Sequence, residues 1–280
     1  MCSNDIKSMS PGDVAPGLFL TERAHIIADF FIWACTDSFL IEIGRALWTP
    51  ARDHLEKFLV ADDVEFEELT TLDILELEGS TAAAALTPLF LDASELQCWR
   101  FITSDDVMIA NFPRFGALAF TLLAERDKLA AITAKLRAAA TPELDPDALN
   151  AVRIEHGLAR IAVDTDEKTL AVEARLDRAI SLTKGCYIGQ ETIERATAHG
   201  SLKKKLFGLR LSGGRAPESG APVMMEGKQV GRLTSYAVSA RLGGIALAIL
   251  HHSAWEPGTA VIIKDQEGEL PATVSDLPFI

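Results

Sequence analysis

The pattern of the sequence changes near residue 205, and this change constrains the fold more than any other feature. Upstream of it, strand-like runs alternate with amphipathic helical stretches, whereas downstream only short runs rich in branched residues remain. Turns with paired glycines, such as Gly213-Gly214 and Gly243-Gly244, separate these runs. Short strands joined by such turns are typical of an all-β barrel or sandwich. We therefore predict a β-domain over residues 205–280, after a first region over residues 1–204. Its strands are expected at residues 206–211, 229–235, 245–250, 260–264 and 273–277.

The first region opens with two strand-like runs, residues 17–31 and 39–43, which are rich in branched and aromatic residues. A helix is expected to follow. Thr49 is the predicted N-cap because its hydroxyl can accept a hydrogen bond from a free amide, and Pro50 suits the first helical position.

The same arrangement recurs later in this region. A strand is predicted over residues 116–123, and the helix after it carries Leu129, Ile132 and Leu136 at helical spacing. Repeated strand-then-helix units predict α+β lobes in which helices cover one face of a sheet, and the ferredoxin-like lobe is the natural candidate.

A further helix is predicted to start at Asp145 and Pro146, since aspartate suits the N-cap and proline the first helical position. We expect Leu149 and Val152 on its buried face. Gly157 is expected to end this helix in a left-handed conformation.

The charge balance excludes several classes of partner. With 40 acidic and 27 basic residues among 280, the net charge is −13, which disfavours nucleic-acid and anionic-membrane surfaces.

The four cysteines are far apart and form no C-x-x-C pair, so neither a disulfide framework nor a metal site is predicted. No run approaches about 18 apolar residues, and the first residues carry no export signal. We therefore expect a cytoplasmic protein.

Residues 184–195 form the most informative segment. Between residues 184 and 210, six lysines or arginines stand against two glutamates in an otherwise acidic chain. Gly185 and Gly189 would allow a close backbone approach or a positive φ, and a helix starting after them would offer free amides to an anion. Lys184 and Arg195 would flank that site with positive charge, so we expect an anionic ligand here.

Simpler interpretations of this segment stay open. The glycines could serve only a turn, Cys186 could be a small buried apolar group, and residues 203–205 could be a solvated strand start. Alternatively, Cys186 is a candidate nucleophile or redox-sensitive thiol, because a helix N-terminus and Lys184 would favour its thiolate. No histidine lies close to it in the sequence. His251-His252 is interpreted as a surface strand end.

The stretch K-G-C-Y-I-G-Q-E at residues 184–191, with Arg195 after it, closely resembles the signature of the YgfZ family of folate-binding proteins. This family is related to the glycine cleavage system T-protein. The resemblance extends over essentially the whole chain. Its other matching stretches are residues 3–7, 20–29, 77–86, 153–157, 164–173, 231–235 and 245–248.

The resemblance implies two ferredoxin-like lobes and a C-terminal antiparallel β-barrel, arranged around a central channel that holds tetrahydrofolate. It also implies a role in iron–sulfur cluster assembly or repair, with iron–sulfur proteins as partners. Glu173 would suit the amino groups of the pterin, and Lys184 or Arg195 the glutamate tail. Glu173 could equally be a surface residue. The remaining ligand-side positions implied are Asp5, Gly185, Tyr187, Gly189, Gln190 and Glu191, and the catalytic candidates are Cys186 and Asp29.

Two features depart from the family pattern. The T-protein reaction depends on an aspartate whose position is taken here by Ala28, so aminomethyl transfer loses its acid or base unless Asp29 substitutes. The segment at residues 3–7 normally follows a substantial N-terminal strand and helix. We therefore expect that the natural N-terminus lies further upstream, and that one sheet edge in the first lobe lacks its neighbour.

Three hypotheses follow. The first is a folate-binding accessory protein for iron–sulfur enzymes that has no aminomethyl turnover. The second is a folate-dependent aminomethyl transferase that uses Asp29 or Asp5. The third is an interaction scaffold that keeps the fold without the ligand.

Overall fold

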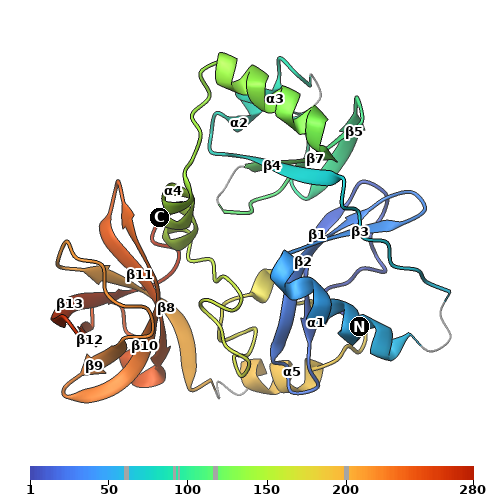
Figure 1. Ribbon diagram of the computed structural model, residues 1–280. Coiled ribbons are helices and arrows are strands. Elements are labelled where there is room, and N and C mark those ends of the chain that lie inside the picture. Colours follow the sequence, from blue (N-terminus) through green and yellow to red (C-terminus); the bar gives the residue numbers. More distant parts are fainter. Residues whose placement is uncertain (60–62, 91–92, 94, 116–118, 199–201) are drawn as a thin grey trace. The chain divides into compact units, whose positions relative to one another are not determined.

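The computed structural model describes residues 1–59, 63–90, 93, 95–115, 119–198 and 202–280, which form two compact units (Figure 1). Neither unit is continuous in the sequence. The first unit contains Met1–Ser3, Leu18–Asp29 and Leu144–Ile280, and the second contains Asn4–Gly17 and Phe30–Glu143.

The first unit contains a closed antiparallel barrel with the strand order β10-β11-β8-β13-β12-β9 (Figure 1). This barrel confirms the prediction of an all-β domain, which the sequence pattern leaves open between a barrel and a sandwich. Branched and aliphatic side chains such as Leu209, Leu233 and Ile263 fill its interior, where they are fully buried. The strands are β8 (Lys204–Leu211), β9 (Pro222–Met225), β10 (Lys228–Ser239), β11 (Gly243–His251), β12 (Ala260–Asp265) and β13 (Gly268–Ser275). Sequence patterning missed β9, because four residues are too few to show an alternation.

Helix α4 (Pro146–Glu155) packs on the outside of the barrel, against β10 and β11. Its start is confirmed, since the Asp145 side chain accepts a hydrogen bond from the Ala148 amide at 2.7 Å. The predicted buried face is wrong: Leu149 and Val152 are only half-buried, whereas Ala151 and Ile154 are buried. The helix is rotated because its charged residues also turn toward the barrel. Arg153 and Glu155 are 4% and 5% exposed, and Gly157 ends the helix with a φ of +67°.

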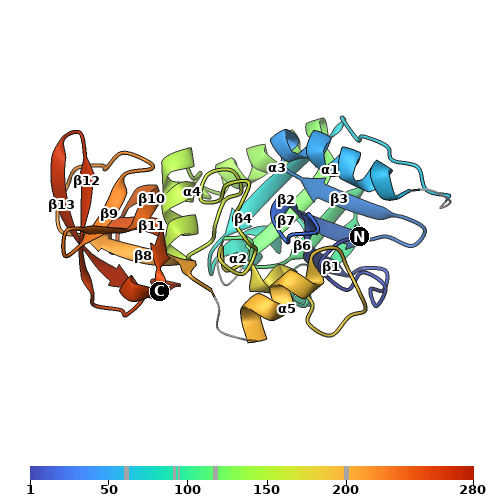
Figure 2. The same ribbon diagram turned by 90° about the horizontal axis from the view of Figure 1, so that it is seen from below.

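The rest of the first unit packs around the turn that joins β1 (Val14–Leu20) to β2 (Ile26–Ala34). Helix α5 (Gln190–Ala198) lies against this hairpin, as Figure 2 shows, and its Ile193 shares a core with Leu18 and Leu20. Ser3 is fully buried, and its hydroxyl donates to the carbonyl of Ala179 in the short 3₁₀-helix η2 (Asp177–Ala179).

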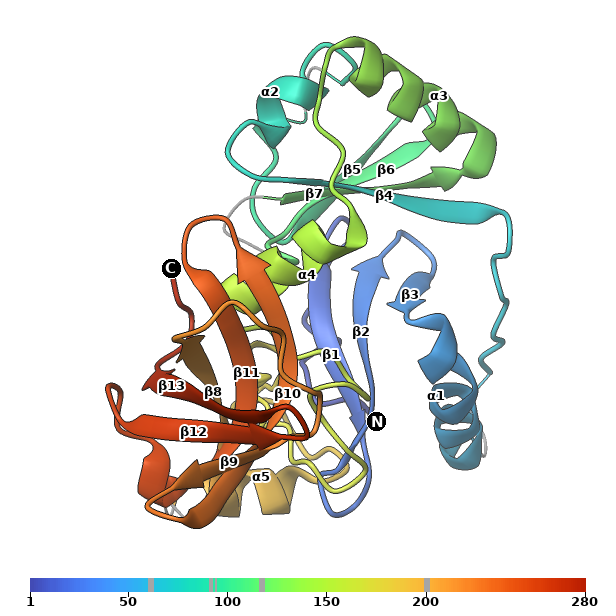
Figure 3. The ribbon, with the colours of Figure 1, turned by 60° about the vertical axis from the view of Figure 1, so that its left-hand side comes forward.

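The second unit contains a four-stranded sheet with the order β4-β7-β6-β5. Helices α2 and α3 cover one face of it (Figure 3), and Leu129, Ile132 and Leu136 of α3 are buried as predicted. Residues 116–118 of the predicted strand lie outside the described residues. The elements are β4 (Leu72–Glu78), α2 (Ala82–Leu86), β5 (Arg100–Ser104), β6 (Val107–Asn111), β7 (Ala119–Glu125) and α3 (Arg126–Ala138).

Strand β3 (Phe39–Ile43) pairs with β2 in a three-stranded sheet of order β1-β2-β3, and α1 (Arg45–Phe58) follows it. The predicted start of this helix at Thr49 and Pro50 is wrong. The first hydrogen bond of the helix is donated by the Leu47 amide to the Gly44 carbonyl, over a distance of 2.8 Å. Pro50 therefore lies inside the helix. A proline near the start of a helix removes only one hydrogen bond, and the turn before it can therefore form.

The predicted fold class, α+β lobes followed by an antiparallel β-barrel, is confirmed. The arrangement around a central channel and the division at residues 204 and 205 stay predictions.

Candidate functional site

A recess of about 490 Å³ in the first unit brings together two residues that the sequence singled out, Glu173 and Arg195. It is formed by α5, by the beginning of β8 and the end of β11, and by the segment before Glu173. This volume is within the range of about 300–1,000 Å³ that small-molecule sites occupy. The lining residues are Leu170, Glu173, Thr192, Arg195, Ala196, Leu202, Lys203, Lys204 and His251.

Glu173 is the buried acid of the recess. It is only 6% exposed, so the interpretation of Glu173 as a surface residue is wrong. Its Oε2 accepts a hydrogen bond from the Leu170 amide at 2.9 Å and lies 3.6 Å from Lys204 Nζ. Burial raises the pKa of this carboxyl, while the Leu170 amide and the Lys204 charge oppose the rise. Both contacts hold the Glu173 carboxylate through Oε2, and Oε1 takes part in neither of them.

Basic side chains line the recess together with this acid. Arg195 is exposed on α5, and Lys203 and Lys204 precede or begin β8. His251 lies opposite Lys204 in the register of β8 and β11. Three permanent cations on one small surface, in a chain of net charge −13, make this recess attractive to an anionic group.

The sequence interpretation missed three of these residues, Lys203, Lys204 and His251. The excess of lysine and arginine between residues 184 and 210 was the available signal for the two lysines. No local pattern could have found His251, because only the pairing of β11 with β8 brings it next to Lys204.

Gly189 shapes the beginning of α5, as the sequence predicted. It has a φ of +86°, and a Cβ there would lie 2.8 Å from the Thr21 carbonyl oxygen and 3.0 Å from Ala24 Cα. Only glycine fits such a position without strain. Gly185 differs from Gly189: its φ is not positive, and a Cβ there would meet nothing within 4 Å, so no close approach within the described residues requires glycine at this position.

Gln190 and Glu191 do not line the recess. The Gln190 side chain accepts a hydrogen bond from the Tyr187 amide at 3.2 Å and donates to Glu194 at 2.6 Å. Glu191 is exposed in the first turn of α5. Gln190 therefore organises the entry into the helix, and the Glu191 carboxylate adds a negative charge at the helix end that would otherwise attract an anion.

Lys184 and Tyr187 contact each other outside the recess. Lys184 Nζ donates to the Cys2 carbonyl at 2.9 Å and lies 5.4 Å from the centre of the Tyr187 ring. Tyr187 is 8% exposed, and its buried hydroxyl finds no hydrogen-bond partner within the described parts of the chain. Burial, and then the charge of Glu194, raise the pKa of this hydroxyl. Cys186, between them, is exposed and does not line the recess either.

The two candidate aspartates are not among the residues that line the recess. Asp29 is half-buried on β2, and Ala28 next to it is fully buried. Because successive side chains of a strand point to opposite faces, Asp29 does not occupy the side of the sheet on which Ala28 lies. Asp5 belongs to the second unit.

The described residues contain no group of three or more histidine, cysteine, aspartate or glutamate side chains placed to hold a metal ion. Within the same residues, we find no helix with the length and hydropathy needed to cross a membrane.

Comparison with known proteins identifies the family. Residues 1–184 match the GCVT N-terminal domain, and residues 204–280 match the glycine cleavage T-protein C-terminal barrel domain. An aminomethyltransferase of Rubrobacter xylanophilus is 25% identical over 287 residues, covering 100% of this chain and 76% of that protein. An aminomethyltransferase of Halothermothrix orenii is 28% identical over 217 residues, covering 74% of this chain and 60% of that protein.

The fold is also shared with a solved structure. The crystal structure of glycine cleavage system aminomethyltransferase T from Bartonella henselae superposes with a TM-score of 0.90 at 21% identity. The match covers 100% of this chain and 79% of that one. With both domains matched in order along the chain, this protein belongs to the glycine cleavage T-protein family.

Proposed function

We propose that this protein binds tetrahydrofolate and, like the YgfZ proteins that its signature resembles, supports the assembly or repair of iron–sulfur clusters. The observation that carries the proposal is the recess itself, in which one buried carboxylate lies among cations. Folates combine a pterin with N–H donors and a tail with carboxylates, so they need both kinds of group. Aminomethyltransferases are among the relatives, which supports a folate ligand.

Within the recess, we assign particular roles to the lining residues. Glu173 would accept hydrogen bonds from the pterin amino group, since charge-assisted bonds of this type are the strong ones. Leu170 and Leu202 would contact the flat ring. Arg195 and Lys203 are better placed than Lys184 to bind the tail, because Lys184 already donates to the Cys2 carbonyl and does not line the recess.

The YgfZ-type role is favoured over aminomethyl transfer by Ala28. The buried methyl group of Ala28 cannot relay a proton, and the Asp29 side chain lies on the opposite face of the strand. The relatives named as aminomethyltransferases make a folate-dependent aminomethyl transferase the second candidate.

Calorimetric titration with 5-formyltetrahydrofolate tests the ligand. We expect saturable binding, weakened about tenfold by Arg195→Ala or Lys203→Ala, since each removes one charge-assisted contact. Lys228→Ala is the matched control, because Lys228 is an exposed lysine at the start of β10 and does not line the recess. Absence of binding to the folded protein, or equal weakening by Lys228→Ala, would overturn the proposal.

Two further assays separate the candidate functions. If the YgfZ-type role is correct, the folate-bound protein will not release a one-carbon unit from an aminomethylated carrier protein. It will, however, restore iron–sulfur enzyme activity in a host whose own related gene is deleted. Turnover that disappears in Asp29→Asn would instead establish the transferase.

A further inference from the structure

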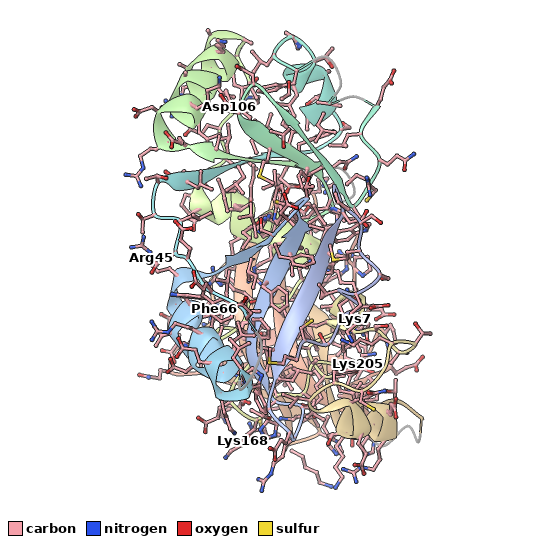
Figure 4. All side chains as sticks on the ribbon, turned by 90° about the vertical axis from the view of Figure 1, so that its right-hand side faces the viewer. Lys7, Arg45, Phe66, Asp106, Lys168 and Lys205 are labelled. Atoms are coloured by element: carbon pink, nitrogen blue, oxygen red, sulfur yellow. The ribbon has the colours of Figure 1, made fainter. Side chains whose placement is uncertain are left out.

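The second unit contains a separate recess of about 320 Å³, which shares no residue with the site described above. All five residues of β3 line it, together with Trp48 of α1 and residues 65–69 of the segment that leads to β4. Arg45 and Phe66, both labelled in Figure 4, are also part of the lining. We call this recess the β3 groove.

The β3 groove exposes several large apolar side chains. Phe39 is 50% exposed, Leu69 and Ile74 are each 42% exposed, and Phe66 is 36% exposed. Large apolar side chains that gather on one surface, instead of being scattered singly, mark interaction sites. The proposed folate function leaves this surface unused.

Strand β3 also has backbone groups available for pairing. It is the last strand in the order β1-β2-β3, and in the described parts of the chain it pairs only with β2. The other edge of β3 therefore presents N–H and C=O groups that an extended peptide can pair with. Such a peptide would direct alternate side chains toward the apolar lining of the groove.

The charge of the groove selects the partner. Glu65, Glu67 and Glu68 line it and are exposed, whereas Arg45 is its single basic lining residue. None of the three glutamates lies within 4.0 Å of a cation contributed by the described residues. The net charge of −13 makes a second copy of this chain a poor occupant, since two acidic grooves would repel each other.

We propose that the β3 groove binds an extended segment of a partner protein in which apolar residues alternate with lysine or arginine. The segment adds to β3 as a further strand, places its apolar side chains against Phe66 and Trp48, and turns its basic side chains toward the three glutamates. This inference does not depend on the folate function.

Fluorescence anisotropy with a labelled nine-residue peptide of alternating valine and lysine tests the proposal in the full chain. We expect saturable binding that Glu65→Gln/Glu67→Gln/Glu68→Gln weakens at least tenfold, because three charge contacts are lost. Phe66→Ala, which removes a partly exposed ring, should weaken binding by a similar factor while leaving the melting temperature unchanged. A peptide of alternating valine and glutamate should not bind.

A control separates this site from general attraction to an acidic protein. Glu167→Gln/Glu218→Gln/Glu256→Gln makes the same change in net charge at exposed glutamates of the first unit. It should change the affinity less than twofold.

Hydrogen exchange provides the second readout. Strand addition should slow amide exchange in residues 39–43 when the valine–lysine peptide is bound. Equal weakening by the two triple variants, or binding without slower exchange at residues 39–43, would overturn the proposal. So would a dimer of the chain itself that Phe66→Ala dissociates.

Discussion

Arg153 and Asp164 form an ion pair that is buried on both sides: Nη1 lies 2.7 Å from Oδ2, with 5% and 0% of the two side chains exposed. The same guanidinium donates to the Leu158 carbonyl and to the Ser235 hydroxyl, at 2.6 and 2.8 Å. The Thr234 hydroxyl donates to the other carboxylate oxygen. One pair therefore connects α4, the segment after it and strand β10.

We predict that Asp164→Asn lowers the free energy of unfolding by about 3–5 kcal/mol, because it leaves the buried arginine without its counter-charge. Urea denaturation monitored by circular dichroism measures this loss. Arg137 and Glu143 provide the control, since both side chains are more than half exposed. Glu143→Gln should cost less than about 1 kcal/mol. A loss from Asp164→Asn no larger than that of the control would contradict the prediction.

The two glycines of the signature segment should respond differently to the same substitution. Gly189 has a positive φ, and Gly189→Ala places a Cβ 2.8 Å from the Thr21 carbonyl oxygen. This substitution should lower the free energy of unfolding by more than about 2 kcal/mol. Gly185→Ala meets open space and should change the free energy of unfolding by less than about 1 kcal/mol. Thermal unfolding of the pair tests this contrast, and equal melting temperatures would refute it.

Glu78 should make stability depend on pH. Burial, and then the neighbouring charge of Glu76, raise its pKa from 4.5 to about 7, against the opposing effects of Arg114 and the Phe115 amide. The folded state therefore holds a proton that the unfolded state releases between these values. The free energy of unfolding should fall as the pH rises from about 4.5 to 7, by about 2 kcal/mol once water around this partly exposed group is allowed for.

Glu78→Gln isolates this contribution, because the amide stays neutral throughout. Urea unfolding at several pH values between 4.5 and 8 should show the wild-type protein losing stability relative to the variant. Parallel curves for the two proteins would show that Glu78 titrates normally.

Glu173→Gln should separate stability from ligand binding. Since burial raises the pKa of this carboxyl, its ionised form is disfavoured in the folded state, and a neutral amide should not reduce stability at pH 7. The same change removes the charge that would bind the pterin amino group, so the affinity for 5-formyltetrahydrofolate should fall about tenfold. Thermal unfolding of the variant measures the effect on stability, and calorimetric titration measures the effect on affinity. Unchanged affinity would place the pterin elsewhere.

Local patterns predicted the parts of the fold that local chemistry determines. Asp145 and Gly157 define the two ends of α4 because an N-cap and a left-handed glycine act within one turn of the helix. The rotation of α4 could not be predicted in this way. It depends on Arg153 and Glu155 finding partners in β10 and in the segments next to it, far away in the sequence.

The same limit applies to the candidate site. Glu173 and Arg195 could be singled out by resemblance to a family and by local charge. Their neighbour His251 could not, because the pairing of Lys204 with His251 is a property of the barrel register. Lys184, the most conspicuous cation of the signature, donates to the Cys2 carbonyl, a partner 182 positions away.

The division into two discontinuous units limits when each unit can complete its contacts during synthesis. Ser3 donates to the Ala179 carbonyl across 176 positions, and residues 18–29 share their core with residues after 170. During synthesis, the first residues of the chain must therefore wait for nearly two-thirds of it to be translated. The second unit, which lies mostly within residues 30–143, can fold in that interval. Early arrest of translation would leave the apolar side chains of residues 18–29, such as Leu18, Leu20 and Ile26, without the later residues that cover them.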